Sequence, residues 1–253
     1  MKKIFIPIIA GLLISAASGG NVAVAQQDAA CELSREKFAE ISGAQNDLAP
    51  DSTGRIREEL RVRKSLLREV VDCATKELSS LKSDFEKIKS GSQEARALQA
   101  QFSPWFSETL NYYALQKSAI NDLGLQGSKD FARNFHAWRG GNFRPTSKTI
   151  LQFAVWAQNQ EFVQIAQNRL NQVKRAIDVF GLGINEEIRE GSRAAEIELQ
   201  KALALNRQAK EIIRTYGDSD EAGKATKYSL EFLASTYQKI LELAEKINKA
   251  IVR

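Results

Sequence analysis

The residue types that most often carry chemistry are scarce in this chain. His136 is the only histidine, and Cys31 and Cys73 are the only cysteines. A metal site normally needs three or four converging ligands, and a Ser-His-Asp triad would have to use His136 without a Gly-x-Ser-x-Gly turn to present its serine. We therefore expect no catalytic residues, no metal site and no cofactor, and we predict that the protein is not an enzyme.

The acidic residues that do cluster have a simpler explanation. Glu186, Glu187 and Glu190 stand at the expected start of a helix, where carboxylates complement the positive end of the helix dipole. Acid–base catalysis would instead need one carboxylate with a raised pKa in a cleft. The preceding Gly181-Leu182-Gly183 resembles the start of a dinucleotide loop, but it follows a helix and lacks the third glycine. We interpret it as a turn.

One stretch combines the side chains of a binding surface. Between Phe131 and Gln160 the chain has no Asp or Glu, and aromatic residues stand among bases there. Arginine pairs with carboxylates or phosphates, and tryptophan supplies contact area. We predict a binding patch made of Lys129, Arg133, Trp138, Arg139, Phe143, Arg144 and Lys148. The alternative is that Phe131, Phe135 and Trp138 only pack a short helix onto the rest of the fold, leaving the arginines in solvent.

A second polar surface is rich in amides. It comprises Gln158, Asn159, Gln160, Gln164, Gln167, Asn168, Asn171 and Gln172. These residues predict either an uncharged face turned to solvent or an interface along one helix.

The first 25 residues have the pattern of a secretory signal peptide. Lys2 and Lys3 precede an apolar run from Ile4 to Ala17, and Ala23-Val24-Ala25 is a small-residue cleavage site. The run is shorter than the roughly 20 residues that a spanning helix needs, which argues against a retained anchor. We predict bacterial export to the periplasm or the exterior. Loss of the two lysines lowers the net charge from +5 to +3, so nucleic acid is not an expected partner.

Export also affects the interpretation of the two cysteines. An even number of cysteines in an oxidising compartment favours a disulfide, so we predict a bridge between Cys31 and Cys73. Two buried free thiols are one alternative, because a sequence does not show that the Cβ atoms meet. A lipid-modified Cys31 is another.

Helical periodicity runs through the mature chain and is interrupted by glycines and prolines. It predicts an all-α fold, an elongated antiparallel bundle of about four long helices with a small helical middle region. After an N-terminal segment at 26–54 we expect the bundle over 55–253, with 92–147 as a smaller insertion. The long helices are predicted at 55–89, 148–180, 185–216 and 220–251.

Three local expectations complete the plan. Within the insertion, Ser103-Pro104 indicates the start of a helix, and Gly140 to Pro145 indicates a loop. In the helix at 148–180, one apolar face is predicted to hold Val155, Phe162, Ile165, Leu170, Val173, Ile177 and Phe180.

A signal peptide followed by a long helical bundle with a small middle region is similar to the plan of type IV secretion minor pilins. We therefore expect an exported, non-enzymatic interaction or structural subunit of the bacterial cell envelope. Its expected partner is an envelope or surface protein, and a homo-oligomer is compatible with this plan. The alternative function is a membrane-active helical protein that binds anionic lipid surfaces.

Overall fold

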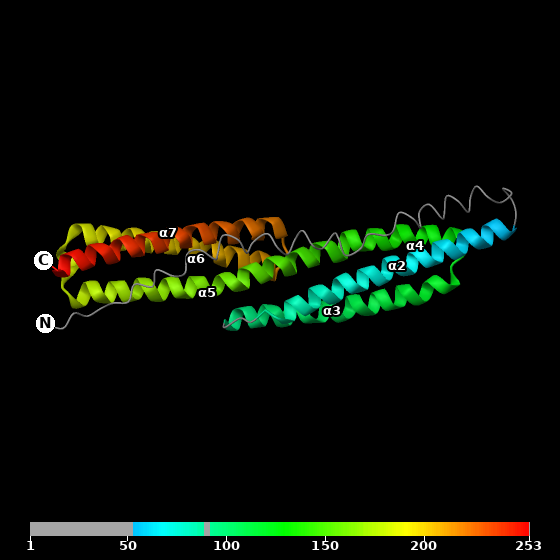
Figure 1. The fold of residues 1–253 in the computed structure, drawn as a ribbon, viewed down its shortest axis with the longest axis horizontal. Coiled ribbons are helices and arrows are strands. Elements are labelled where there is room, and N and C mark those ends of the chain that lie inside the picture. Colours follow the sequence, from blue (N-terminus) through cyan, green and yellow to red (C-terminus); the bar gives the residue numbers. More distant parts are fainter. Residues whose placement is uncertain (1–52, 89–91, 253) are drawn as a thin grey trace. The chain divides into compact units, whose positions relative to one another are not determined.

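The computed structural model describes residues 53–88 and 92–252, and every regular element within these ranges is helical (Figure 1). The α-helices are α2 (Thr53–Glu86), α3 (Gln93–Ala119), α4 (Leu125–Trp138), α5 (Arg144–Val179), α6 (Glu186–Arg214) and α7 (Ser219–Val252). Three short segments join them: the 3-10 turns η2 (Ile120–Asp122) and η4 (Leu182–Ile184), and the π-helical turn η3 (Arg139–Phe143). The predicted all-α fold is confirmed.

Several expectations concern residues outside these ranges. The signal peptide, the segment 26–54 and Cys31 all lie outside the described residues, so the disulfide to Cys73 stays a prediction. Cys73 itself is half-buried on α2. Among the helices that are described, none is both long enough and apolar enough to cross a membrane.

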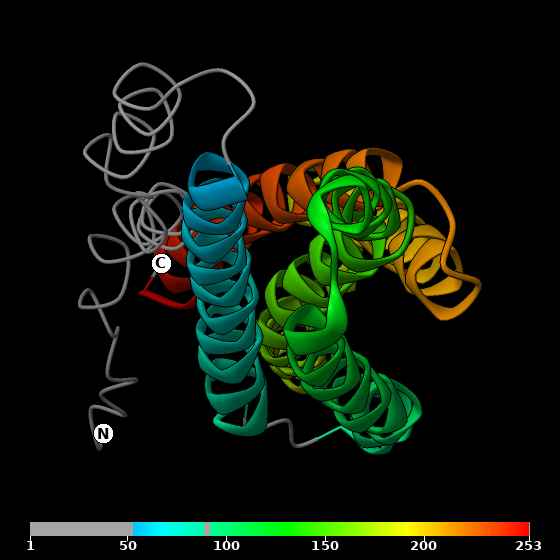
Figure 2. The ribbon, with the colours of Figure 1, turned by 90° about the vertical axis from the view of Figure 1, so that its right-hand side faces the viewer.

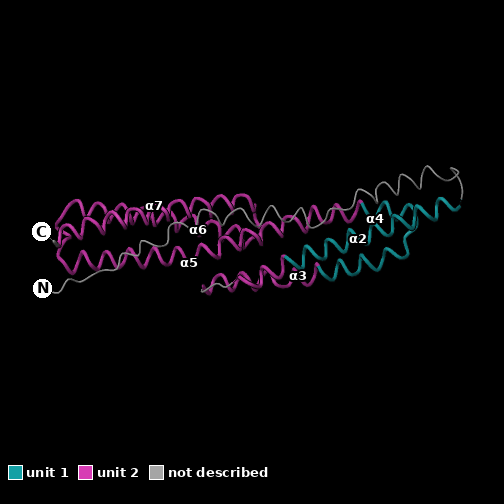
Figure 3. The backbone as a smooth tube through the Cα atoms, in the orientation of Figure 1, with its two compact units in different colours: residues 1–80, 110–132 teal, residues 81–109, 133–253 magenta. Residues whose placement is uncertain are grey.

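The chain divides into two compact units (Figure 3). The first comprises 1–80 and 110–132, and the second comprises 81–109 and 133–253. The boundaries fall inside α2, α3 and α4, so each of these helices gives one part to each unit. The predicted domain limits stay predictions, because compactness alone does not define a folding domain.

In the first unit, polar contacts tie α2 to the end of α3 and to η2. Lys64 Nζ donates to the backbone oxygen of Asn121, and Arg68 Nη2 donates to its side-chain oxygen, both at 2.7 Å. Lys117 Nζ lies 2.6 Å from Asp72 Oδ1. The contact with the Asn121 backbone satisfies a carbonyl where helical partners run out. The buried side chains of this unit include Val62, Leu66, Val71, Ala74, Leu78, Tyr113, Ile120 and Phe131.

In the second unit, α5, α6 and α7 form a three-helix bundle joined by short turns (Figures 1 and 2). Its core includes Val163, Ala166, Leu170, Ala195, Leu199, Ala202, Leu233 and Ile240. Side chains cap two of the helices: Asn185 accepts from Ile188 N at 3.2 Å, and Asp218 Oδ1 accepts from Asp220 N at 2.8 Å. These caps explain why helices begin at the predicted turns.

Helix α3 passes through Pro104, so the prediction that a helix begins at Ser103-Pro104 is wrong. Phe102 and Phe106 are fully buried on either side of the proline, and Phe102 packs against Phe153 of α5 at 5.6 Å between ring centroids. A proline in a helix interior costs about 3 kcal/mol. Burying each phenylalanine returns about 1.5 to 3 kcal/mol, which offsets that cost.

The segment from Gly140 to Pro145 is also helical, so the prediction of a loop there is wrong. The π-helical turn η3 leads directly into α5, and Asn142 Nδ2 donates to Trp138 O at 3.2 Å. In an α-helix the ring of a proline clashes with the carbonyl of the residue four positions before it. The wider turn that precedes Pro145 relieves this restriction, and burial of Phe143 holds the turn in place.

The buried face of α5 differs from the predicted one. Val155, Phe162 and Ile165 are exposed by 45%, 44% and 46%, whereas Asn159 is 1% exposed. Leu170 and Ile177 are buried as predicted. Two apolar stripes lie on this helix, and periodicity does not tell which of them meets α6 and α7. The fold buries the stripe that contains Phe153, Trp156, Val163, Ala166 and Leu170.

Candidate functional site

The predicted basic patch is only partly at the surface. Within the second unit Arg133, Arg144 and Lys148 are exposed, whereas Trp138 and Arg139 are half-buried. Phe143 is 1% exposed and belongs to the core. Lys129 is exposed on the part of α4 that belongs to the first unit.

The buried aromatic residues support this surface from below. Phe143 stacks on Trp105 of α3, with ring centroids 5.8 Å apart and an interplanar angle of 21°. The Arg139 guanidinium carbon lies 4.9 Å from the centroid of Phe143, a cation–π distance. Phe131 and Phe135 are buried as well. The phenylalanines therefore pack inside, and the bases are what the surface presents.

Arg144 and Lys148 are two exposed charges of this stretch. They stand one helical turn apart at the start of α5, and neither side chain forms an ion pair or hydrogen bond within the described residues. Because η3 and α5 form continuous helical backbone, these bases do not face a free helix N-terminus, where the dipole would oppose them.

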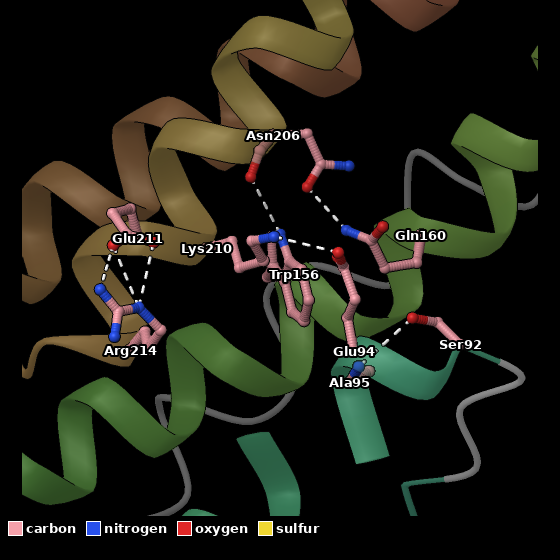
Figure 4. A network of polar contacts seen from close by, with 9 residues as sticks. All are labelled: Ser92, Glu94, Ala95, Trp156, Gln160, Asn206, Lys210, Glu211 and Arg214. Atoms are coloured by element: carbon pink, nitrogen blue, oxygen red, sulfur yellow. Dashed lines mark hydrogen bonds and ion pairs between the residues drawn. The ribbon is translucent and has the colours of Figure 1, made fainter. Parts of the chain in front are cut away.

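The amide-rich face of α5 separates into a buried and an exposed part. We call Asn159, Gln160 and Asn206 the inner amides. Gln160 Nε2 donates to Asn206 Oδ1 at 2.7 Å, and the buried indole of Trp156 donates to the Asn206 backbone oxygen at 3.1 Å (Figure 4). Beside them Lys210 Nζ lies 3.1 Å from Glu94 Oε1. These contacts join α5 to α6, and α6 to the start of α3.

Asn159 links α5 to α7. Its Nδ2 donates to Ser229 Oγ at 3.1 Å, and that hydroxyl donates to the Ala202 backbone oxygen of α6 at 2.9 Å. The buried Asn159 Oδ1 accepts no hydrogen bond from the described residues. A buried acceptor without a donor costs about 1 to 3 kcal/mol.

The exposed part of the amide face lines a groove of about 310 Å³ between α5 and α6. We call its amides Gln164, Gln167, Asn168, Asn171 and Gln200 the outer amides. Leu170 and Leu199, both buried, also line the groove, and at one end Lys174 Nζ pairs with Glu196 Oε2 at 2.8 Å. The outer amides form no side-chain hydrogen bond within the described residues.

The hollowed surface continues around α6. A second, more open depression is lined by Arg193, Glu196, Ile197, Gln200, Lys201 and Ala204. It shares Glu196 and Gln200 with the first groove, and Ile197 is 47% exposed within it. This part of the surface is not evident from the sequence, because the residues of α6 join the amides of α5 only through tertiary packing.

Other chemistry finds little support in the described ranges. They contain no group of three or more His, Cys, Asp or Glu side chains arranged to hold a metal ion, and His136 is exposed on α4. Lys246 hydrogen-bonds to Glu187 at 2.8 Å and holds the pKa of that carboxyl below its ordinary value. A general acid would need the opposite shift.

Comparison with known proteins does not identify a relative: no protein family, no curated protein and no solved structure matches this chain.

Proposed function

We propose that this chain is an exported, non-enzymatic interaction or structural subunit of the bacterial cell envelope, and that it binds an acidic protein partner. The observation that carries the proposal is the pair Arg144 and Lys148, exposed and without partners in the described residues. Export rests on the N-terminal pattern of the sequence.

The surroundings of the pair favour a partner with a charged surface over a partner with an apolar surface. The stretch from Phe131 to Gln160 has no acid to neutralise the bases, and its phenylalanines are buried. Phe143, stacked on Trp105, holds the backbone beneath the bases in one position. A cationic surface offers electrostatic complementarity to an acidic partner, which contributes mostly to specificity and association rate.

The test is crosslinking and affinity capture from envelope extracts with the full chain. The variant Arg144→Glu/Lys148→Glu should lose a defined protein partner that the wild type captures. The matched control is Arg207→Glu/Lys224→Glu, which reverses two exposed bases on α6 and α7 and changes the total charge equally. Capture should also weaken as salt rises, because exposed charges are screened.

Two results would count against the proposal. Equal loss of the partner in both variants would show that total charge matters and not this surface. Binding of the wild type to anionic vesicles, with no protein partner captured, would favour the alternative of a membrane-active protein. Leakage of dye from those vesicles would strengthen that alternative.

A further inference from the structure

We propose that the groove between α5 and α6 is a self-association site, in which the outer amides of one copy of this chain bind those of a second copy. This site is separate from Arg144 and Lys148 and does not depend on the proposed acidic partner.

The outer amides carry donors and acceptors that the described residues leave unused. Each amide side chain carries two N–H donors and an accepting oxygen. On the same helix Asn159 and Gln160 donate hydrogen bonds inside the bundle, to Ser229 and Asn206. The outer amides begin one turn further on and make no side-chain hydrogen bond within the described residues. Amide donors and acceptors therefore line the groove, where water or another molecule can bind them.

The groove is chemically complementary to a second copy of itself. A patch of one charge repels an identical patch, but an amide donates and accepts at once and so pairs with its own kind. A two-fold interface sets the same patch against itself, so its side chains must complement identical side chains. The only charges that line the groove, Lys174 and Glu196, already pair with each other at 2.8 Å.

The shape of the groove also suits a second copy. The hollow between α5 and α6 has Leu170 and Leu199 among its lining residues, so amides of a second copy that enter it meet an apolar surface as well as polar ones. Two such helix pairs face to face make a four-helix arrangement, a common way to pack helices. Ile197, 47% exposed beside the groove, extends the contact.

The size of the groove predicts a weak complex. From Gln164 to Lys174 it runs about 15 Å along α5, and two helices are about 20 Å wide, so each copy buries about 300 Å². Stable interfaces bury at least about 1,200 Å² in total. We therefore expect a weak, transient dimer that forms only at high protein concentration.

Sedimentation equilibrium of the full chain over a wide range of concentration tests the proposal. Gln167→Glu/Asn171→Asp keeps the shape of both side chains but sets like charges against each other. It should raise the dissociation constant at least about tenfold at neutral pH. The matched control, Gln158→Glu/Gln172→Glu, adds the same charge to exposed positions of α5 outside the groove and should leave it unchanged. Circular dichroism verifies that every variant is folded.

Two further measurements separate a specific contact from a general charge effect. Mixing Gln167→Glu with Gln167→Lys should restore association that neither variant shows alone. Association of Gln167→Glu/Asn171→Asp should also return below about pH 4, because a protonated carboxyl resembles an amide. A wild-type chain that stays monomeric at millimolar concentration would overturn the proposal, as would equal weakening by the groove variant and its control.

Discussion

Two sets of amides on neighbouring turns of the same helix have different roles. The inner amides Asn159 and Gln160 are drawn into the bundle and bonded to α7 and α6, whereas the outer amides from Gln164 to Asn171 face a groove. Their chemistry is the same, so position in the bundle alone decides between a structural and a binding role. A polar residue identifies a potential contact, and the tertiary structure determines whether the protein itself makes that contact.

The difference also has an energetic side. Hydrogen bonds inside the bundle contribute only about 0.5 to 1.5 kcal/mol each, but a buried group that loses its partner costs about 1 to 3 kcal/mol. Truncation of an exposed amide costs little, because its hydrogen bonds are made to water in the folded and the unfolded chain alike. Substitutions in the two sets should therefore differ in unfolding, and the following predictions test this difference in order of decreasing effect.

The largest effect is expected at Trp156, whose buried indole donates to the backbone of the inner amide Asn206. Trp156→Ala removes a side chain that is 1% exposed and the donor to the Asn206 backbone oxygen. The free energy of unfolding should fall by about 3 to 5 kcal/mol. Denaturant unfolding followed by circular dichroism measures it. Gln167→Ala, on the same helix but in the groove, should change it by less than about 0.5 kcal/mol. Similar losses in both variants would break the comparison.

The next effect is expected at Asn206. Asn206→Ala leaves Gln160 Nε2 without its 2.7 Å acceptor and should lower the free energy of unfolding by about 1 to 3 kcal/mol. Gln200→Ala, an outer amide on the same helix, is the matched control and should be nearly neutral. The double variant Gln160→Ala/Asn206→Ala isolates the contact. A coupling energy of zero between the two positions would show that this hydrogen bond does not stabilise the contact between α5 and α6.

The smallest effect has the opposite sign. Asn159→Leu removes a buried oxygen that accepts no hydrogen bond from the described residues, and it adds apolar surface to the core. The variant should gain about 1 kcal/mol in the free energy of unfolding, although it loses the donor to Ser229. Thermal unfolding at fixed protein concentration measures the gain. A clear loss would mean that the bond to Ser229 outweighs the orphaned acceptor.

Much of the fold was predictable, because it depends on local signals. The periodicity of apolar residues predicted helices at 148–180, 185–216 and 220–251, close to the observed α5, α6 and α7. Turns around Asn185 and Asp218 appear where cap residues follow glycines. The first and last residues of these helices are set by residues nearby in the sequence.

Three features were not predictable, because each depends on contacts with distant residues. Pro104 and Gly140-Gly141 are local signals for an end or a loop, yet buried Phe102 and Phe143 keep the backbone helical there. On α5, Val155 and Phe162 were placed in the core and are exposed. Phe143 of the predicted patch is buried. So are its neighbours Phe131 and Phe135, for which the packing alternative predicted burial.

The helical character of the described residues and the places of the three C-terminal helices follow from the sequence alone, since spacing and capping act over a few residues. The sequence also identified the basic stretch and the amide-rich face as the unusual surfaces. Tertiary packing sets which amides turn inward and which stripe of α5 meets its neighbours. It also brings Gln200 of α6 to the groove. The reason is that burial is a property of the assembled bundle, in which the buried face of each helix depends on the helices that pack against it.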